Sequence, residues 1–130
     1  IWSRLVGSEM CIRDRLIDFD ISKSNASIFL TKVSNPEEFG VVEIVEDKIK
    51  SIEEKPQKPK SNYIAVGLYF FDSQCFEYIK SIKKSSRGEY EITSLIDKYL
   101  INGTLEYYFT SGWWIDAGTP EAIEKIENLI

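Results

Sequence analysis

The segment Tyr63–Phe71 constrains the fold more than any other part of the sequence, because it is rich in aromatic and β-branched residues. That composition is typical of a strand, and we expect this strand to be central in a sheet, with Tyr69 as a core candidate. Residues 26–33 have the same character and predict a buried strand, and Leu105–Phe109 predicts another. The chain must therefore bury a sheet of several strands.

A hairpin and three helices complete this pattern. Gly40–Val45 and residues 49–53 predict a hairpin, and apolar residues at helical spacing predict helices over 73–82, Ile92–Ile101 and Pro120–Leu129. We expect Ser73 to cap the first helix, with inward residues Phe76, Ile79 and Ile82 in the first, Leu95, Ile96, Tyr99 and Leu100 in the second, and Ile123, Ile126 and Leu129 in the third. Strands and helices that alternate in this way predict one mixed α/β domain.

The composition narrows the possible functions. The 130-residue chain is long enough for one compact domain or for a piece of a larger one. Its formal net charge of −5 argues against a binder of nucleic acid or of membrane surfaces. The sequence has no histidine, so its chemistry must rest on carboxylates, lysine, arginine and backbone groups. Cys11 and Cys75 have no metal-ligand spacing, which fits a reducing, cytoplasmic location.

The first residues differ in character from the rest. Residues 1–15 show neither strand alternation nor a sustained helical pattern, and the string resembles translated sequencing-adapter read-through. We therefore expect 1–15 to be a non-native leader and 16–130 to be the native part. A genuine short arm is the alternative. If the leader is foreign, we expect the native protein to extend upstream of Leu16.

A carboxylate near the end of the chain lies between a predicted strand and a predicted helix. Residues 113–116 predict the strand, and Thr119 and Pro120 suit the N-cap and first turn of the helix. Asp116 would then lie at the carboxyl end of a strand, where open α/β sheets bind ligands, and is a candidate for a hard metal ion. An aspartate that only closes a turn is the alternative. Trp114 is a core candidate that could instead form the wall of a sugar pocket.

The end of the predicted hairpin carries a second candidate site. Glu54 and Lys55 follow its last strand, where a carboxylate suits sugar hydroxyls and an ammonium suits a phosphate. The alternative is a solvated charge run at the end of an edge strand. Gly40, at the start of the hairpin, permits a ligand to approach the backbone closely, or is simply a turn glycine.

An arginine beside a glycine forms a third candidate. Arg87 precedes two carboxylates and a predicted helix, and its guanidinium could clamp a phosphate or pair with Glu89 or Glu91 on the surface. Glu91 and Thr93 are candidates for the first-turn and capping groups of that helix.

Order and spacing together indicate a family. The relevant motifs, in chain order, are Phe39-Gly40-Val41-Val42, Glu53-Glu54-Lys55-Pro56, Ser61-Asn62-Tyr63 leading into Gly67-Leu68-Tyr69-Phe70, Arg87-Gly88-Glu89-Tyr90-Glu91-Ile92-Thr93, and Trp114-Ile115-Asp116-Ala117-Gly118-Thr119. From about residue 24 to the end, the chain resembles the sugar-phosphate nucleotidylyltransferases, most of all their glucose-1-phosphate thymidylyltransferase branch. The resemblance implies the C-terminal part of a Rossmann-like nucleotidyltransferase fold, with a mixed sheet flanked by helices.

The resemblance also implies a reaction and roles for residues. Members transfer a nucleotidyl group from a nucleoside triphosphate, here dTTP, to a sugar 1-phosphate, here glucose 1-phosphate, and release pyrophosphate with Mg²⁺ as cofactor. Asp116 would be one of two metal carboxylates. The catalytic residues would be Lys55 and Arg87, which would hold the sugar phosphate. Glu54 would hold sugar hydroxyls, and Gly40, Ala65, Tyr69 and Trp114 would complete the substrate site.

Three departures from the family pattern define what this sequence can do alone. The glycine-rich phosphate loop and the second metal carboxylate belong upstream, and Ala117 replaces the threonine usual in the thymidylyltransferase branch. We therefore expect 16–130 to be the sugar-phosphate-binding part, inactive alone, of an enzyme that assembles as a homo-oligomer and binds neither nucleic acid nor membrane. A uridylyl- or guanylyl-transferase for another sugar 1-phosphate and a non-catalytic regulatory subunit are the alternatives.

Overall fold

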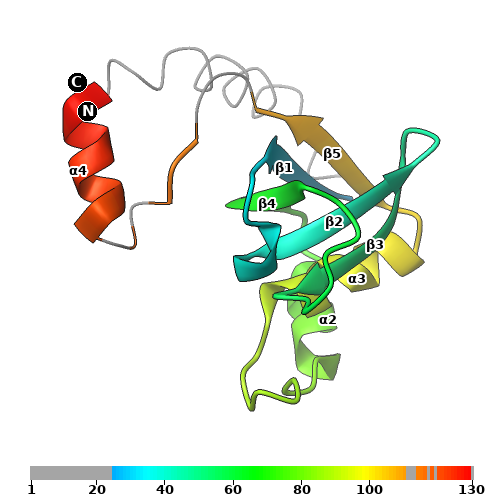
Figure 1. Ribbon diagram of the computed structural model, residues 1–130. Helices are drawn as coiled ribbons and strands as arrows, with labels where there is room; N and C mark the ends of the chain where they lie inside the picture. The colour runs from blue at the N-terminus through cyan, green and yellow to red at the C-terminus, as the bar shows by residue number, and fades with distance from the viewer. Residues whose placement is uncertain (1–24, 111–113, 117, 119, 130) are drawn as a thin grey trace.

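The computed structural model describes residues 25–110, 114–116, 118 and 120–129. In this part of the chain, five strands form one mixed sheet in the order β3-β2-β4-β1-β5 (Figure 1). Strand β1 is antiparallel to β4 and parallel to β5. The strands are β1 (Ala26–Lys32), β2 (Gly40–Val45), β3 (Lys48–Glu54), β4 (Tyr63–Phe71) and β5 (Leu105–Phe109). The predicted α/β fold is confirmed, and β4 is central, as its composition predicts.

The predicted hairpin forms from β2 and β3, and its register decides which residues meet at its open end. Gly40 pairs with Glu54 there. At the closed end, Glu46 and Asp47 have φ angles of 50° and 58°, the left-handed conformation typical of a two-residue hairpin turn. The motifs at the start of β2 and the end of β3 are therefore neighbours in space.

The helices follow the predicted pattern along the chain. A short 3-10 helix, η2 (Pro36–Glu38), precedes β2, and the α-helices are α2 (Cys75–Ser81), α3 (Ile92–Ile101) and α4 (Pro120–Leu129). Helices α2 and α3 lie together on one side of the sheet, and α4 lies apart from them (Figure 1). Among the described residues, no helix has the length and apolar character needed to cross a membrane.

Helix α3 packs against the sheet with the face that its spacing predicts. It contributes Ile96 to a buried cluster that also contains Ile28, Leu30, Val42 and Ala65. Ile44, Ile49 and Ile52 of the hairpin pack against the same cluster. Because hairpin and helix share this core, the first turn of α3 is held beside the open end of the hairpin.

The start of α2 differs from the prediction. The helix begins at Cys75 with Gln74 in the N-cap position, so Ser73 does not cap it. The backbone N–H of Gln74 instead donates a 3.0 Å hydrogen bond to Oδ1 of Asp72. The prediction was wrong because an aspartate one residue earlier satisfies the free N–H groups of this turn.

The inward face of α2 also differs from the prediction. Phe76 and Ile79 are exposed, and the residues that pack on the core are Cys75, Tyr78 and Ile82. The Tyr78 ring meets the Tyr99 ring of α3 edge to face, with centroids 4.9 Å apart. This contact rotates α2 so that its tyrosine, rather than its phenylalanine, faces the core.

The segment before α4 is not the predicted strand. Residues Trp114, Ile115 and Asp116 have no regular secondary structure. The expected cap, Thr119, lies outside the described residues, as do Trp113 and the expected leader over 1–15. Helix α4 itself has the predicted bounds.

Candidate functional site

The open end of the hairpin places a glycine against a carboxylate. A Cβ atom at position 40 would lie 3.3 Å from Oε2 of Glu54, so the missing side chain is what leaves room beside that carboxylate. The backbone N–H of Lys55 donates a 2.9 Å hydrogen bond to the carbonyl of Phe39, which extends the pairing by one residue. Gly40, Glu54 and Lys55 therefore lie together at the open end of the hairpin.

The first turn of α3 closes one side of this site. Thr93 is buried, and its hydroxyl hydrogen-bonds to the carboxylate of Glu54. Its Cγ2 atom would lie 3.1 Å from a Cβ at position 40. Thr93 reaches this place because it lies three residues before Ile96 and so shares the inward face of the helix.

Several charges surround the carboxylate of Glu54. Burial raises its pKa, and the nearby Glu91 carboxylate raises it further. Arg87 and Lys55 act in the opposite direction, because a nearby cation favours the charged form of a carboxyl group. Two cations and two carboxylates thus lie within electrostatic reach of one another at the start of α3.

The loop before α3 holds the arginine. Nε and Nη2 of Arg87 donate hydrogen bonds of 3.1 and 3.0 Å to Oε1 of Glu91. Glu89 lies farther away, with Oε2 3.7 Å from Nη2. The surface pairing considered as an alternative to phosphate binding therefore forms, although the Glu91 side chain is only 14% exposed.

Lys55 lies in a loop whose backbone is strained at the lysine and tied to β2 farther along. Lys55 has a φ of 45°, a left-handed conformation that residues with a side chain rarely adopt. Pro56, which follows it, is buried. Farther along, the hydroxyl of Ser61 donates a hydrogen bond to the carbonyl of Val42, which ties the loop to β2. Strained backbone of this kind is concentrated at functional sites.

Three other residues predicted for the substrate site differ in how close they come to this charged cluster. Tyr69 is close enough to Glu54 that this carboxylate raises the pKa of its phenol, an effect secondary to burial. Trp114 packs edge to face on Phe39, beside Gly40, with ring centroids 5.4 Å apart. The side chain of Ala65 is part of the buried core, so it can offer a ligand only its backbone.

The cluster combines a partly buried carboxylate, two cations and an unobstructed glycine. Such a set can bind a ligand that carries both hydroxyl groups and a phosphate. A family model described as nucleotidyl transferase matches residues 7–130. The chain belongs to the nucleotidyl transferase family.

Named members of the nucleotidyl transferase family are similar to this chain in sequence. The chain is 44% identical over 108 residues to a glucose-1-phosphate thymidylyltransferase from Neisseria meningitidis serogroup A, covering 81% of this chain and 38% of that protein. It is 45% identical over 112 residues to one from Mycobacterium tuberculosis, covering 84% of this chain and 39% of that protein. These relatives are nucleotidyltransferase enzymes, and the chain spans about two fifths of their length.

Solved structures of the family have the same fold. A Bacillus anthracis chain assigned as a glucose-1-phosphate thymidylyltransferase, in complex with a sucrose, superposes with a TM-score of 0.81 at 46% identity. The match covers 91% of this chain and 48% of that one. A UDP-glucose pyrophosphorylase complexed with UDP-glucose has a TM-score of 0.71 at 24% identity, which establishes similarity of fold alone.

The candidate metal ligand lies apart from the charged cluster in the sequence and has one hydrogen bond of its own. Asp116 is exposed, and its Oδ1 accepts a 3.1 Å hydrogen bond from the N–H of Gly118. The aspartate therefore does close a turn. Across the described residues, no group of three or more acidic or sulfur side chains could hold a metal ion. One carboxylate fits Mg²⁺ only as part of a larger ligand set, which is how this ion commonly binds.

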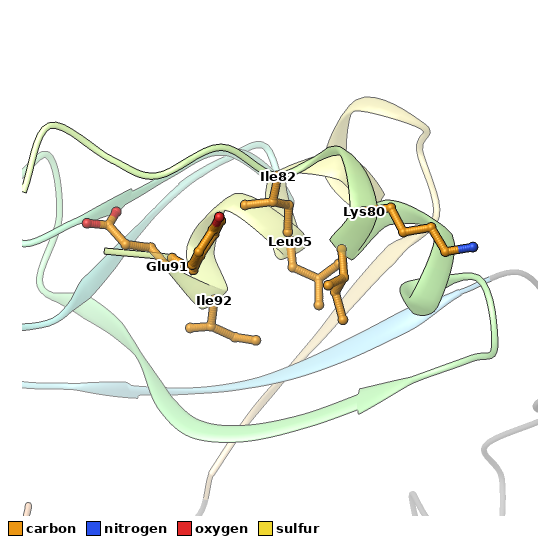
Figure 2. Close-up of a pocket in the computed structure, with 7 residues that line it drawn as sticks. Lys80, Ile82, Glu91, Ile92 and Leu95 are labelled. Atoms are coloured by element: carbon orange, nitrogen blue, oxygen red, sulfur yellow. The ribbon is translucent and has the colours of Figure 1, made fainter. Parts of the chain in front are cut away.

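A cavity of about 520 Å³ borders the cluster on the α2 side. Ile82, Ile92 and Leu95 line it, with Lys80 and Glu91 at opposite ends (Figure 2). Figure 2 shows the carboxylate of Glu91 turned away from the apolar residues. This apolar cavity does not suit a sugar phosphate, so the charged cluster remains the candidate site.

The sequence assigned Thr93 only to the start of the helix, and it left Glu91 open between that role and a surface pair with Arg87. The structure places Thr93 on Glu54, and it confirms Glu91 as the partner of Arg87. A signal for Thr93 was available, because it is a polar residue on the predicted inward face of α3. No sequence signal distinguishes Glu91 from Glu89 as the partner of Arg87, since that choice depends on the loop conformation.

Proposed function

We propose that this chain forms the sugar-phosphate-binding part of a glucose-1-phosphate thymidylyltransferase. The whole enzyme would transfer a thymidylyl group from dTTP to glucose 1-phosphate and release pyrophosphate. The main support is the meeting of Glu54, Lys55 and Arg87 at the open end of the hairpin. The identity to named thymidylyltransferases adds to it.

Each group of the cluster suits one part of this substrate. The carboxylate of Glu54 would accept hydrogen bonds from sugar hydroxyls, and Gly40 would let the sugar approach the backbone. Lys55 and Arg87 would bind the phosphate, the first as a point charge and the second through its planar fork of N–H groups. Trp114 and Tyr69 would border the sugar.

The chemistry requires positioning rather than an acid or base from this chain. The sugar phosphate oxygen would attack the α-phosphorus of the nucleotide in line, and pyrophosphate would leave. Lys55 and Arg87 would hold the attacking phosphate and balance its charge. A sequence without histidine is compatible with such a reaction.

Asp116 would be one carboxylate of the magnesium site. Mg²⁺, when bound, would neutralise charge on the nucleotide phosphates. Because the chain spans about two fifths of the length of its relatives, we assign the other carboxylate and the nucleotide loop to the rest of the enzyme.

Calorimetric titration of the 130-residue chain with glucose 1-phosphate tests the binding half of this proposal. We expect binding, with affinity at least tenfold weaker in Lys55→Ala. Lys58→Ala is the matched control, because Lys58 is an exposed lysine of the same loop. Equal affinities in the two variants would return Lys55 to the role of a solvated surface charge.

A chimera tests turnover. The upstream part of the Bacillus anthracis relative is joined to this chain, and pyrophosphate release from glucose 1-phosphate is measured with dTTP, UTP and GTP. We expect a preference for dTTP and a loss of Mg²⁺-dependent turnover in Asp116→Asn, whose side-chain oxygen can still accept the Gly118 hydrogen bond. Preference for UTP or GTP would move the assignment to a uridylyl- or guanylyl-transferase, and binding without turnover would favour a regulatory subunit.

A further inference from the structure

One edge of the Arg87 guanidinium is fully engaged by a single carboxylate oxygen. Nε and Nη2 both donate to Oε1 of Glu91, at 3.1 and 3.0 Å. Because a guanidinium is planar, this contact fixes the direction of the two N–H groups on Nη1 and of the second N–H on Nη2. Arginine held in this way loses less freedom when its other edge binds an anion.

Glu91 is itself fixed from several directions. It occupies the N-cap position of α3, and its side chain accepts a hydrogen bond from Ser85 as well as those from Arg87. Ser85 is in turn tied into the loop, because its N–H donates to the carbonyl of Glu89 at 2.8 Å. Ser85 Oγ also accepts a 3.2 Å hydrogen bond from the N–H of Arg87. The carboxylate is therefore a rigid support that connects the arginine to the helix.

The same loop contains an internal comparison. Glu89 carries the same charge near the same guanidinium, but it is 3.7 Å from Nη2 and 70% exposed. An exposed pair at that distance contributes little and does not fix the geometry. A comparison of variants at Glu89 and Glu91 therefore separates the effect of charge on phosphate binding from the effect of arginine orientation.

We propose that Glu91 is a positioning residue, which orients Arg87 so that its free edge meets the phosphate of the sugar 1-phosphate. This inference rests on the proposed function, because it assumes that Arg87 binds that phosphate. Glu91 does not touch the substrate. It acts through the arginine, from the side opposite to the ligand.

If Glu91 acts through its charge, removal of the carboxylate should strengthen phosphate binding. If it acts by orienting Arg87, removal should weaken phosphate binding. Glu91 is negative, so loss of its charge alone would strengthen the binding of an anion. Loss of its hydrogen bonds frees the Arg87 side chain, which must then be ordered when the phosphate binds. If orientation dominates, Glu91→Ala weakens phosphate binding although it removes a repelling charge.

Calorimetric titrations of the 130-residue chain with glucose 1-phosphate and with inorganic phosphate test this sign. We expect Glu91→Ala to weaken both affinities about three- to tenfold. Glu91→Gln should restore most of the affinity, because its amide oxygen can accept from Nε and Nη2 without the charge. Glu89→Ala should leave the affinities unchanged or slightly stronger. Tighter or unchanged binding in Glu91→Ala, or equal effects of the two alanine variants, would overturn the proposal.

A spectroscopic measurement gives a second readout without any ligand. The Nε–H signal of Arg87, identified by its absence in Arg87→Lys, should be protected from exchange in the wild type and in Glu91→Gln. In Glu91→Ala that protection should disappear, and its persistence would count against Glu91 as the support. If the wild type binds neither probe, the proposed function fails. If the wild type binds both glucose 1-phosphate and inorganic phosphate, and Arg87→Lys weakens this binding while Glu91→Ala does not, only the positioning role fails.

Discussion

Gly40 and Glu54 face each other across the open end of the β2–β3 hairpin, and the space between them exists only because position 40 has no side chain. A Cβ there would lie 3.3 Å from Oε2 of Glu54 and 3.1 Å from Cγ2 of the buried Thr93. Both distances are tighter than most real Cβ contacts, so one neighbour must move. The glutamate can move most easily, since Oε2 is the end of a flexible side chain.

Gly40→Ala should therefore damage binding more than stability. We expect the affinity for glucose 1-phosphate to fall about tenfold, because the carboxylate is pushed off the Thr93 hydroxyl and the ligand loses its approach to the backbone. The free energy of unfolding should change by less than about 1 kcal/mol. Titration calorimetry and urea unfolding measure the two quantities. Undiminished affinity would show that this space is not used by the sugar.

The raised pKa of Glu54 predicts a pH-dependent stability with a definite sign. Burial, followed by the repulsion from Glu91, makes the native state bind the proton more tightly than the unfolded state does. Stability contributed at this site is therefore highest at low pH and declines as pH rises from the ordinary value of 4.5 through the raised one.

Glu54→Gln removes this penalty. We expect the variant to match the wild type below about pH 4 and to become more stable than it at neutral pH, by less than about 1 kcal/mol because solvent screens a partly exposed group. Urea unfolding across this pH range measures the difference. A variant that loses stability relative to the wild type as pH rises would contradict the sign.

A buried hydrogen bond outside the site should make a larger contribution to stability. The hydroxyl of Tyr99 donates a 2.6 Å hydrogen bond to Oδ1 of Asp72, which is only 5% exposed. Burial and this carboxylate raise the pKa of the Tyr99 phenol, so it stays protonated at neutral pH. Tyr99→Phe would leave the carboxylate one hydrogen bond short in a buried position.

We expect Tyr99→Phe to lower the free energy of unfolding by about 1.5–3 kcal/mol, the range for hydrogen bonds to charged groups. Tyr78→Phe is the control, because its hydroxyl accepts from the exposed Asn102 and should contribute less than about 0.5 kcal/mol. Urea unfolding of the three proteins gives both values. Equal losses in the two variants would mean that the buried hydrogen bond to Asp72 contributes no more to stability than the exposed hydrogen bond of Tyr78.

Elements with a strong local pattern could be predicted from the sequence. The composition of β4 and the apolar spacing of α3 each specify an element without reference to distant residues. The inward face of α2 could not be predicted in this way. A set with Phe76 and Ile79 and a set with Cys75 and Tyr78 both include Ile82 at helical spacing, and the Tyr99 ring decides between them.

The residues of the candidate site were predictable, but their contacts were not. Glu54, Lys55 and Arg87 could be named from their motifs, because their side chains carry the required chemistry. Which glutamate holds Arg87 depends on how the loop folds back on Ser85. The predicted strand before Asp116 failed for a related reason, since a strand requires a partner and apolar composition alone does not provide one.

The tie between Ser61 and β2 predicts a local effect on the lysine loop. The Ser61 hydroxyl donates to the carbonyl of Val42 and accepts a 3.1 Å hydrogen bond from the N–H of Tyr63. Ser61→Ala should cost about 1 kcal/mol of unfolding free energy. Because loss of this tie frees the loop before it loosens the core, trypsin should cleave after Lys60 several times faster than in the wild type. Ser73→Ala, at an exposed serine that caps no helix, is the control and should change neither quantity. If cleavage in Ser61→Ala keeps the wild-type rate while global stability falls, the bond supports the core and does not hold the loop that carries Lys55.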